Sequence, residues 1–134
     1  MVWVVIAAAD EADRLRVLLP RVVSEVEAGD PEGRVLVVDD GSVDDTVALV
    51  VRLMVDREVL ELEPLRHRSG RATALRRGVR RALEDGADVV VTMDADGRVV
   101  PVGPRPLRPA AAGDTPGRRG HRSDCRWCLG ASLA

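Results

Sequence analysis

Two aspartates, Asp94 and Asp96, directly follow an apolar run at residues 89–93. Carboxylates this close together repel each other, so one of them keeps its proton or a cation neutralises both. Carboxylate oxygens suit Mg²⁺ or Mn²⁺, and Mg²⁺ typically combines one or two protein carboxylates with phosphate oxygens. Asp94 and Asp96 are therefore candidate metal ligands that would let an anionic diphosphate approach. The alternative is an ordinary acidic turn completed by Gly97.

A second acidic cluster, Asp39-Asp40-Gly41-Ser42, ends another apolar run. A turn followed by a helix cap explains Ser42 and Asp39, but it does not require a second aspartate. A carboxylate at the end of a strand can also accept hydrogen bonds from a nucleobase N–H group or a ribose hydroxyl. The pattern leaves both interpretations of Asp40 open. A third polar cluster, Ala9-Asp10-Glu11, ends the first apolar run of the chain.

The three clusters stand where predicted β-strands end. The continuous apolar runs at residues 2–9 and 34–40 are typical of strands covered on both faces. Residues 58–63 alternate between polar and apolar types, which predicts an edge strand, and a fourth strand leads into Asp94.

Apolar residues at helical spacing predict three intervening helices, over residues 15–26, 47–54 and 71–83. Pro20 should kink or restart the first helix, because its ring removes a hydrogen-bond donor. Ser42 or Asp44 is the expected N-cap of the second helix, and Asp85-Gly86 should close the third.

This alternation predicts an α/β fold with a mostly parallel sheet, right-handed connections and helices on both faces. In such sheets, ligands bind beyond the carboxyl ends of the strands, at the point where the strand order reverses. The acidic clusters should therefore meet at one end of the sheet.

Composition limits the class of protein. The chain has 134 residues and a mass of 14.4 kDa, enough for one domain with a core. A formal net charge of −2 gives no electrostatic reason to expect nucleic acid as a partner. No run approaches the roughly 20 apolar residues of a membrane span. Two cysteines near the C-terminus form no disulfide framework, so a reducing cytoplasm is expected.

Four stretches, VVIAAADEADRL, VLVVDDGSVDDT, SGRATALRRGV and GADVVVTMDADG, occur in this order and spacing. Together they resemble the N-terminal half of family-2 glycosyltransferases, in particular the polyprenyl-phosphate and dolichyl-phosphate mannosyl- and glucosyltransferases. The resemblance covers residues 2 to about 98. It implies a GT-A fold, that is, a Rossmann-like half-domain that binds a nucleotide diphosphate sugar.

The resemblance also implies an activity. A hexosyltransferase of this family moves a sugar with inversion from a GDP- or UDP-hexose to an acceptor such as a lipid phosphate or a growing glycan. Mg²⁺ or Mn²⁺ would stabilise the leaving diphosphate. The family supplies a general base for hydroxyl acceptors from the second half of the domain, so we identify no catalytic residue in this chain.

In the family, the first strand ends in a Pro-x-Tyr-Asn-Glu pattern that wraps the nucleoside. Glu11 matches the Glu, whereas Ala7, Ala9 and Asp10 stand where Pro, Tyr and Asn are usual. The missing Tyr ring would pack on the base, so its loss predicts weaker nucleotide binding.

The remaining site residues follow from the same resemblance. Val38 and Asp40 match positions that contact the base and the ribose, and Arg71 matches a basic residue that meets the diphosphate; the alternative for Arg71 is a solvated side chain. Asp96 is expected to be the direct metal ligand. The matched Asp-x-Asp motif consists of Asp94, Ala95 and Asp96.

The third predicted helix carries an arginine face. Solvation explains such a face, and the alternative is attraction to an anionic membrane, which would place the protein at the inner face of the cell membrane. The residues concerned are Arg76, Arg77, Arg80 and Arg81.

The resemblance stops after Gly97. Residues 99–134 contain 5 Pro, 5 Gly and 6 Arg without any periodicity, which predicts a disordered or frameshifted tail on a truncated enzyme. In this tail, His121, Cys125 and Cys128 offer three zinc ligands but no evident fourth.

Two other functions stay open. The lack of an acceptor half is also expected of a catalytically inactive module that binds a nucleotide or a protein partner. The stretch MDADG at residues 93–97 resembles the Asp-x-Asp-Gly-Thr nucleophile loop of haloacid-dehalogenase-like phosphatases. That loop would normally follow the first strand, and Arg98 stands here in place of its Thr.

Overall fold

The computed structural model of the chain describes residues 1–99. Strands and helices alternate along them, and the predicted order of elements is confirmed. The strands are β1 (Val2–Ala8), β2 (Arg34–Asp39), β3 (Leu60–Pro64) and β4 (Val89–Asp94). The helices are α1 (Ala12–Gly29), α2 (Thr46–Met54) and α3 (Arg71–Glu84). The predicted tail and its His121, Cys125 and Cys128 lie outside the described residues, apart from Val99, so both remain predictions.

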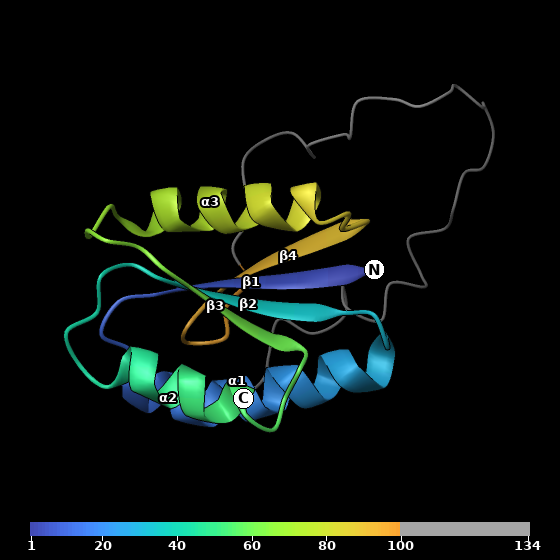
Figure 1. The fold of residues 1–134 in the computed structure, drawn as a ribbon, viewed down its shortest axis with the longest axis horizontal. Coiled ribbons are helices and arrows are strands. Elements are labelled where there is room, and N and C mark those ends of the chain that lie inside the picture. Colours follow the sequence, from blue (N-terminus) through green and yellow to red (C-terminus); the bar gives the residue numbers. More distant parts are fainter. Residues whose placement is uncertain (100–134) are drawn as a thin grey trace. The chain divides into compact units, whose positions relative to one another are not determined.

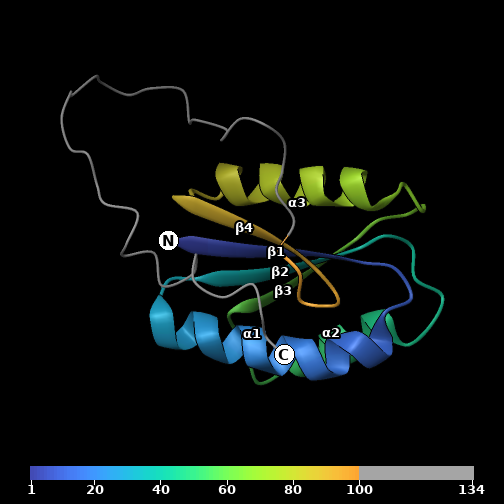
Figure 2. The same cartoon turned by 180° about the vertical axis from the view of Figure 1, so that it is seen from behind.

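The four strands form one parallel sheet in the order β3-β2-β1-β4. Helix α3 covers one face, and α1 and α2 cover the other, as the two opposite views show (Figures 1 and 2). The predicted α/β class and the edge position of β3 are confirmed. The chain proceeds outward from β1 to β2 and β3 and then returns to place β4 on the other side of β1. The strand order therefore reverses between β1 and β4.

The prediction that Pro20 restarts the first helix is wrong, because α1 runs without a break for 18 residues. Pro20 and Arg16 are both exposed, so the carbonyl of Arg16 that loses its helical donor lies on the solvent side. Buried residues at helical spacing hold the opposite face against the sheet on both sides of the proline; they include Leu15, Leu19 and Val23.

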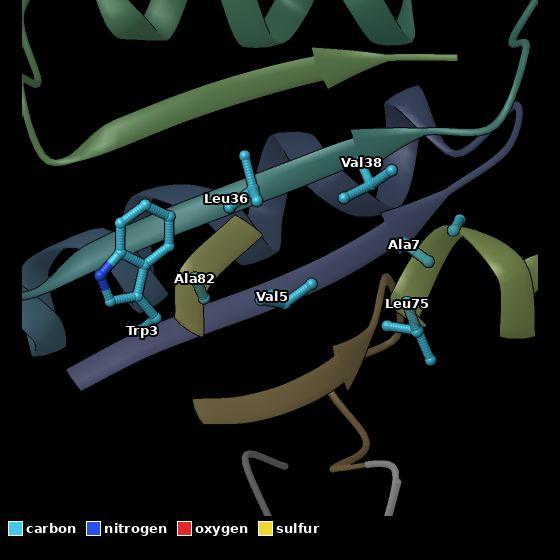
Figure 3. Close-up of a cluster of buried hydrophobic side chains, with 8 residues drawn as sticks. Trp3, Val5, Ala7, Leu36, Val38, Leu75 and Ala82 are labelled. Carbon is cyan, nitrogen blue, oxygen red and sulfur yellow. The ribbon is translucent and has the colours of Figure 1, made fainter. Parts of the chain in front are cut away.

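The core between α3 and the sheet depends on a glycine. Side chains from β1, β2 and α3 pack there, as Figure 3 shows for Val5 and Val38 among others. A Cβ atom on Gly78 would lie 2.4 Å from Cγ1 of Val5 and 2.8 Å from Cγ2 of Val38. The missing side chain therefore lets α3 approach the sheet closely, which fixes the position of the first turn of α3 relative to the strand ends.

The expected N-cap of α2 is also wrong. Asp45 precedes the helix and makes no side-chain cap hydrogen bond. The hydroxyl of Ser42 instead accepts a hydrogen bond from the N–H of Asp10 at 2.9 Å. Asp44 accepts hydrogen bonds from the N–H of Thr46 at 2.9 Å and from the N–H of Ala12 at 3.2 Å. Ser42 therefore binds the loop after β1, and Asp44 binds the start of α1 as well as the start of α2. Within residues 1–99, every helix is too short or too polar to cross a membrane.

Candidate functional site

A pocket of about 160 Å³ lies at the carboxyl ends of β1 and β4, where the strand order reverses. The register explains why it forms, because Ala7 of β1 pairs with Asp94 of β4, and Ala8 pairs with Asp39 of β2. Eight of the nine residues predicted to bind the nucleotide sugar line this pocket: Ala7, Ala9, Glu11, Asp40, Arg71, Asp94, Ala95 and Asp96. The fold thus brings these residues together, while their roles remain predictions.

Val38 is the ninth predicted residue, and it does not line the pocket. Its side chain is completely buried and packs between the sheet and α3 (Figure 3). Successive side chains of a strand point to opposite faces of the sheet, and that of Val38 points into the core. Asp39 and Asp40 follow it at the end of the strand. The predicted contact of Val38 with a base stays a prediction.

Asp94 ends β4, and its two carboxylate oxygens lie in different environments. Oδ2 accepts a hydrogen bond from Nη1 of Arg71 at 2.7 Å, in an ion pair. Oδ1 is buried and has no hydrogen-bond partner among the described residues. A buried carboxylate oxygen without a donor is costly, which makes this atom a candidate ligand for a cation.

Asp96 lies in a tight turn. The N–H of Gly97 donates to the carbonyl of Asp94 at 2.9 Å, and Gly97 has a φ of 86° that favours glycine. Oδ1 of Asp96 accepts a hydrogen bond from the N–H of Arg98 at 3.0 Å. The acidic turn considered from the sequence therefore exists. It uses Oδ1 of Asp96, whose side chain is 35% exposed. Among residues 1–99, the ion-pair partner of Oδ2 is the guanidinium of Arg98, at 3.4 Å.

The pocket residues fit a divalent cation only in part. Oδ1 of Asp94 and the carboxylate of Asp96 are hard oxygen ligands of the kind that Mg²⁺ and Mn²⁺ prefer. Over residues 1–99, however, His, Cys, Asp and Glu side chains form no group of three or more that could hold a metal ion. Residues 1–99 would therefore supply one or two ligands, and phosphate oxygens or water would supply others.

Asp40 has a structural role that sequence reasoning missed. Its side chain is 3% exposed, and its carboxylate accepts hydrogen bonds from the N–H of Ser69 at 2.6 Å and of Gly70 at 2.8 Å. These are the two residues that precede α3, so Asp40 holds the first turn of that helix at the pocket. Asp39 makes the expected turn, because its Oδ2 accepts a hydrogen bond from the N–H of Ser42 at 3.2 Å.

Asp10 joins three loops above the pocket. Its Oδ1 accepts hydrogen bonds from the N–H of Val43 at 2.7 Å and of Asp44 at 3.2 Å, and its Oδ2 contacts Nη2 of Arg68 at 2.5 Å. The hydrogen bond from Val43 and the Arg68 guanidinium lower the pKa of Asp10 below its ordinary value. Asp10 has a left-handed φ of 55°, which Asp tolerates better than most residues.

Arg14 lines the pocket as well, although sequence reasoning did not select it. Its Nη1 lies 3.2 Å from Oε2 of Glu11. The three-residue spacing of Glu11 and Arg14 was the available signal, because residues three apart share one face of a helix. The pocket thus contains two arginine–carboxylate pairs, Arg14 with Glu11 and Arg71 with Asp94.

Comparison with known proteins identifies the family. The sequence pattern of glycosyl transferase family 2 matches residues 3–107. The polyprenol monophosphomannose synthase of Mycolicibacterium smegmatis is 37% identical over 84 residues, which cover 62% of this chain and 32% of that protein. The mannosyltransferase PcManGT of Pyrobaculum calidifontis, solved in complex with GDP-Man and Mn²⁺, is 30% identical, with a TM-score of 0.63 over 71% of this chain and 27% of that one.

The TarS protein of S. aureus, solved with UDP, superposes with a TM-score of 0.61 at 22% identity, over 71% of this chain and 27% of that one, and so shares the fold. The chain spans about a third of the length of the polyprenol monophosphomannose synthase and 27% of the mannosyltransferase. The sequence pattern nevertheless covers most of the chain, including every residue that lines the pocket. The chain therefore belongs to glycosyl transferase family 2.

Proposed function

We propose that this chain is the nucleotide-sugar-binding part of a hexosyltransferase, and that the pocket between β1 and β4 receives the diphosphate of the donor. One observation carries the proposal. The reversal point of the sheet holds two aspartates of an Asp-x-Asp motif, a buried Asp40 and the first residue of α3, Arg71, in one pocket. Its volume, about 160 Å³, is below the range of roughly 300–1,000 Å³ for complete ligand sites, which suits one part of a donor.

Asp96, together with Asp94, would hold Mg²⁺ or Mn²⁺, and the bound cation would offset the charge that develops on the leaving diphosphate. Arg71 adds a second positive group at the same place. It is the first residue of α3, where the helix dipole and free N–H groups favour an anion. The mannosyltransferase of Pyrobaculum calidifontis was solved with Mn²⁺ and GDP-Man, which supports this arrangement.

The nucleoside would lie over the ends of β1 and β2. Asp40 can accept a further hydrogen bond from the ribose or base, because each carboxylate oxygen has two lone pairs and receives one N–H group. Ala9 offers a small apolar surface beside it, in place of an aromatic ring. We therefore expect specific but weak nucleotide binding.

For the donor and acceptor we propose a GDP-hexose and a polyprenyl phosphate. The relatives in which GDP-Man and polyprenol are named support this choice. In the transfer, a phosphate oxygen of the acceptor forms a bond to the anomeric carbon, the bond from that carbon to the diphosphate oxygen breaks, and the nucleoside diphosphate leaves. An anionic acceptor needs no general base. Such an acceptor would place the protein at the inner face of the membrane, near which the exposed Arg76 and Arg80 would lie.

A second candidate function is a nucleotide-binding module without transfer activity. It is favoured by the pocket itself, whose residues offer ligands for a cation and a nucleotide but include none that is assigned to the acceptor. Calorimetry with GDP-mannose and UDP-N-acetylglucosamine, run beside an assay for radiolabelled hexose transfer to polyprenyl phosphate, separates the two. Binding together with transfer supports the enzyme, and binding without transfer or donor hydrolysis supports the module. If neither donor binds in the presence of Mn²⁺, the proposed function is wrong.

A further inference from the structure

We propose that the Arg71–Asp94 ion pair is an internal latch, in which the guanidinium of Arg71 occupies the cation position on Asp94 until a divalent ion and a diphosphate arrive together. This inference rests on the proposed function. It assigns to Arg71 a role in coupling the two ligands, beyond contact with the diphosphate alone.

The ion pair is well placed for such a role. Nη1 of Arg71 lies 2.7 Å from Oδ2 of Asp94, whose side chain is 17% exposed, while the side chain of Arg71 is 61% exposed. The carboxylate is thus held in a partly buried position and the arginine can swing away into solvent. Oδ1 of Asp94, buried and without a donor among the described residues, shows that one arginine satisfies only half of this carboxylate.

Binding a divalent ion and the guanidinium to Asp94 at the same time costs electrostatic free energy. Both are positive, and two positive charges a few ångströms apart in a partly buried pocket repel each other. Because the described part of the chain offers few ligands, a metal ion alone must displace Arg71 and gains little in return. A diphosphate changes this balance, because it supplies oxygen ligands to the metal and a new anionic partner to the released arginine.

The main chain of Arg71 would stay in place during the exchange. Asp40 holds the preceding residues, Ser69 and Gly70, through two backbone hydrogen bonds, and Gly78 sets the close approach of α3 to the sheet. Only the arginine side chain has to rotate. The latch should therefore couple metal and nucleotide without a change in the fold.

The pocket also contains a matched control. Arg14 lines the same pocket and pairs with the carboxylate of Glu11, at 3.2 Å. Replacing Arg14 removes the same charge from the same pocket but leaves the pair on Asp94 intact. A change that is specific to the ion pair with Asp94 can therefore be distinguished from a general change in the pocket charge.

The test uses the full 134-residue chain as wild type, Arg71→Gln and Arg14→Gln, after far-UV circular dichroism has shown that all three are folded. Mn²⁺ binding is measured by electron paramagnetic resonance of the free ion, first without nucleotide and then with saturating GDP. GDP binding is measured by calorimetry in saturating Mn²⁺. We expect Arg71→Gln to bind Mn²⁺ alone about three- to tenfold more tightly than wild type, and GDP in the presence of Mn²⁺ several-fold more weakly.

The latch is identified by a gain in affinity for Mn²⁺ alone together with a loss in affinity for GDP in the presence of Mn²⁺. If Arg71→Gln binds Mn²⁺ alone no more tightly than wild type, while wild type still shows mutual enhancement by Mn²⁺ and GDP, the latch is refuted and the proposed function stands. An equal gain in Mn²⁺ affinity in Arg14→Gln would also refute it, because the charge and not the ion pair would be responsible. If wild type binds GDP neither with nor without Mn²⁺, the proposed function fails and the latch fails with it.

Discussion

The carboxylate of Asp10 lies 2.5 Å from the guanidinium of Arg68, 58 residues further along the chain. The same carboxylate accepts two backbone N–H groups from the loop after β2. Asp10 therefore connects the loops that follow all three of the first strands, and these loops surround the pocket. Two pocket-lining residues adjoin this network. Glu11 follows Asp10 in the sequence, and Asp40 accepts the N–H of Ser69, the residue after Arg68.

Substitutions at Asp10 should separate its hydrogen bonds from its charge. Asp10→Asn keeps an oxygen acceptor for Val43 and a side chain that tolerates a left-handed φ, but it loses the ion pair with Arg68. Asp10→Ala loses the acceptor as well and adds backbone strain. We expect both variants to unfold at lower temperature than wild type, with Asp10→Ala lower by several more degrees. Thermal unfolding followed by circular dichroism tests this order, and equal midpoints for the two variants would contradict it.

The network also predicts a pH dependence. The pKa values of Asp10 and Asp44 are lowered from their ordinary value of 3.8, in Asp10 chiefly by the N–H of Val43 and in Asp44 chiefly by the hydroxyl of Thr46. A carboxyl whose pKa is lower in the folded state stabilises the fold above its unfolded pKa, and this stabilisation is lost as the pH falls through the folded pKa. These two groups should therefore leave stability unchanged between about pH 7 and pH 5 and reduce it below about pH 4.

Urea unfolding over that pH range measures the effect. In Asp10→Asn, residue 10 no longer titrates, so the loss of stability below pH 4 should be smaller than in wild type. An acid loss of the same size in both proteins would show that Asp10 does not contribute.

Asp40→Ala should lower stability as well as nucleotide affinity. Removing this buried carboxylate leaves the N–H groups of Ser69 and Gly70 without their acceptor, which should cost roughly 1–3 kcal/mol in the free energy of unfolding. Hydrogen exchange of these two amides, followed by mass spectrometry, should become faster while exchange in β1 changes little. Unchanged exchange at Ser69 and Gly70 would show that Asp40 does not hold the start of α3.

Gly78→Ala should destabilise the protein although alanine favours helices. The added methyl group would lie within 2.8 Å of both Val5 and Val38, which are buried and β-branched and therefore cannot easily rotate away. Overpacking of this kind costs about 1–3 kcal/mol, against a gain of up to about 1 kcal/mol in helix propensity. Ser24→Ala, at an exposed position in α1, is the matched control and should be neutral within about 0.5 kcal/mol. Chemical unfolding that finds Gly78→Ala as stable as wild type would contradict the packing found here.

Much of the fold could be predicted from the sequence because three of the four strands, β1, β2 and β4, are nearly pure apolar runs that lead into acidic residues, while β3 alternates as an edge strand does. The reversal of strand order then brings the ends of β1 and β4 together, so residues far apart in sequence, Glu11 and Asp94, meet in one pocket. The family resemblance supplied the remaining positions, and the match over residues 3–107 confirms that resemblance.

The side-chain partners could not be predicted, because they depend on loops that are distant in sequence. Asp40 could equally be a turn residue or a nucleotide contact, and only the folded chain shows that the loop before α3 reaches it, 29 and 30 residues later. Serine is a residue type that favours N-caps, and Ser42 was one of two expected caps, yet its hydroxyl binds the N–H of Asp10. Pro20 should break a helix by local rules, but the packing of the buried face of α1 outweighs the loss of one hydrogen bond.

The central claim is that Asp94 and Asp96 hold a divalent cation that bridges to the diphosphate of a nucleotide. Calorimetric titration of wild type, Asp96→Ala and the exposed control Asp56→Ala with GDP and UDP, each with and without Mn²⁺, tests it most directly. Because linkage is reciprocal, we expect Mn²⁺ to strengthen nucleotide binding about tenfold or more in wild type and in Asp56→Ala, and to have no effect in Asp96→Ala. An equal enhancement by Mn²⁺ in wild type and Asp96→Ala would contradict the claim and leave the two aspartates as an ordinary turn.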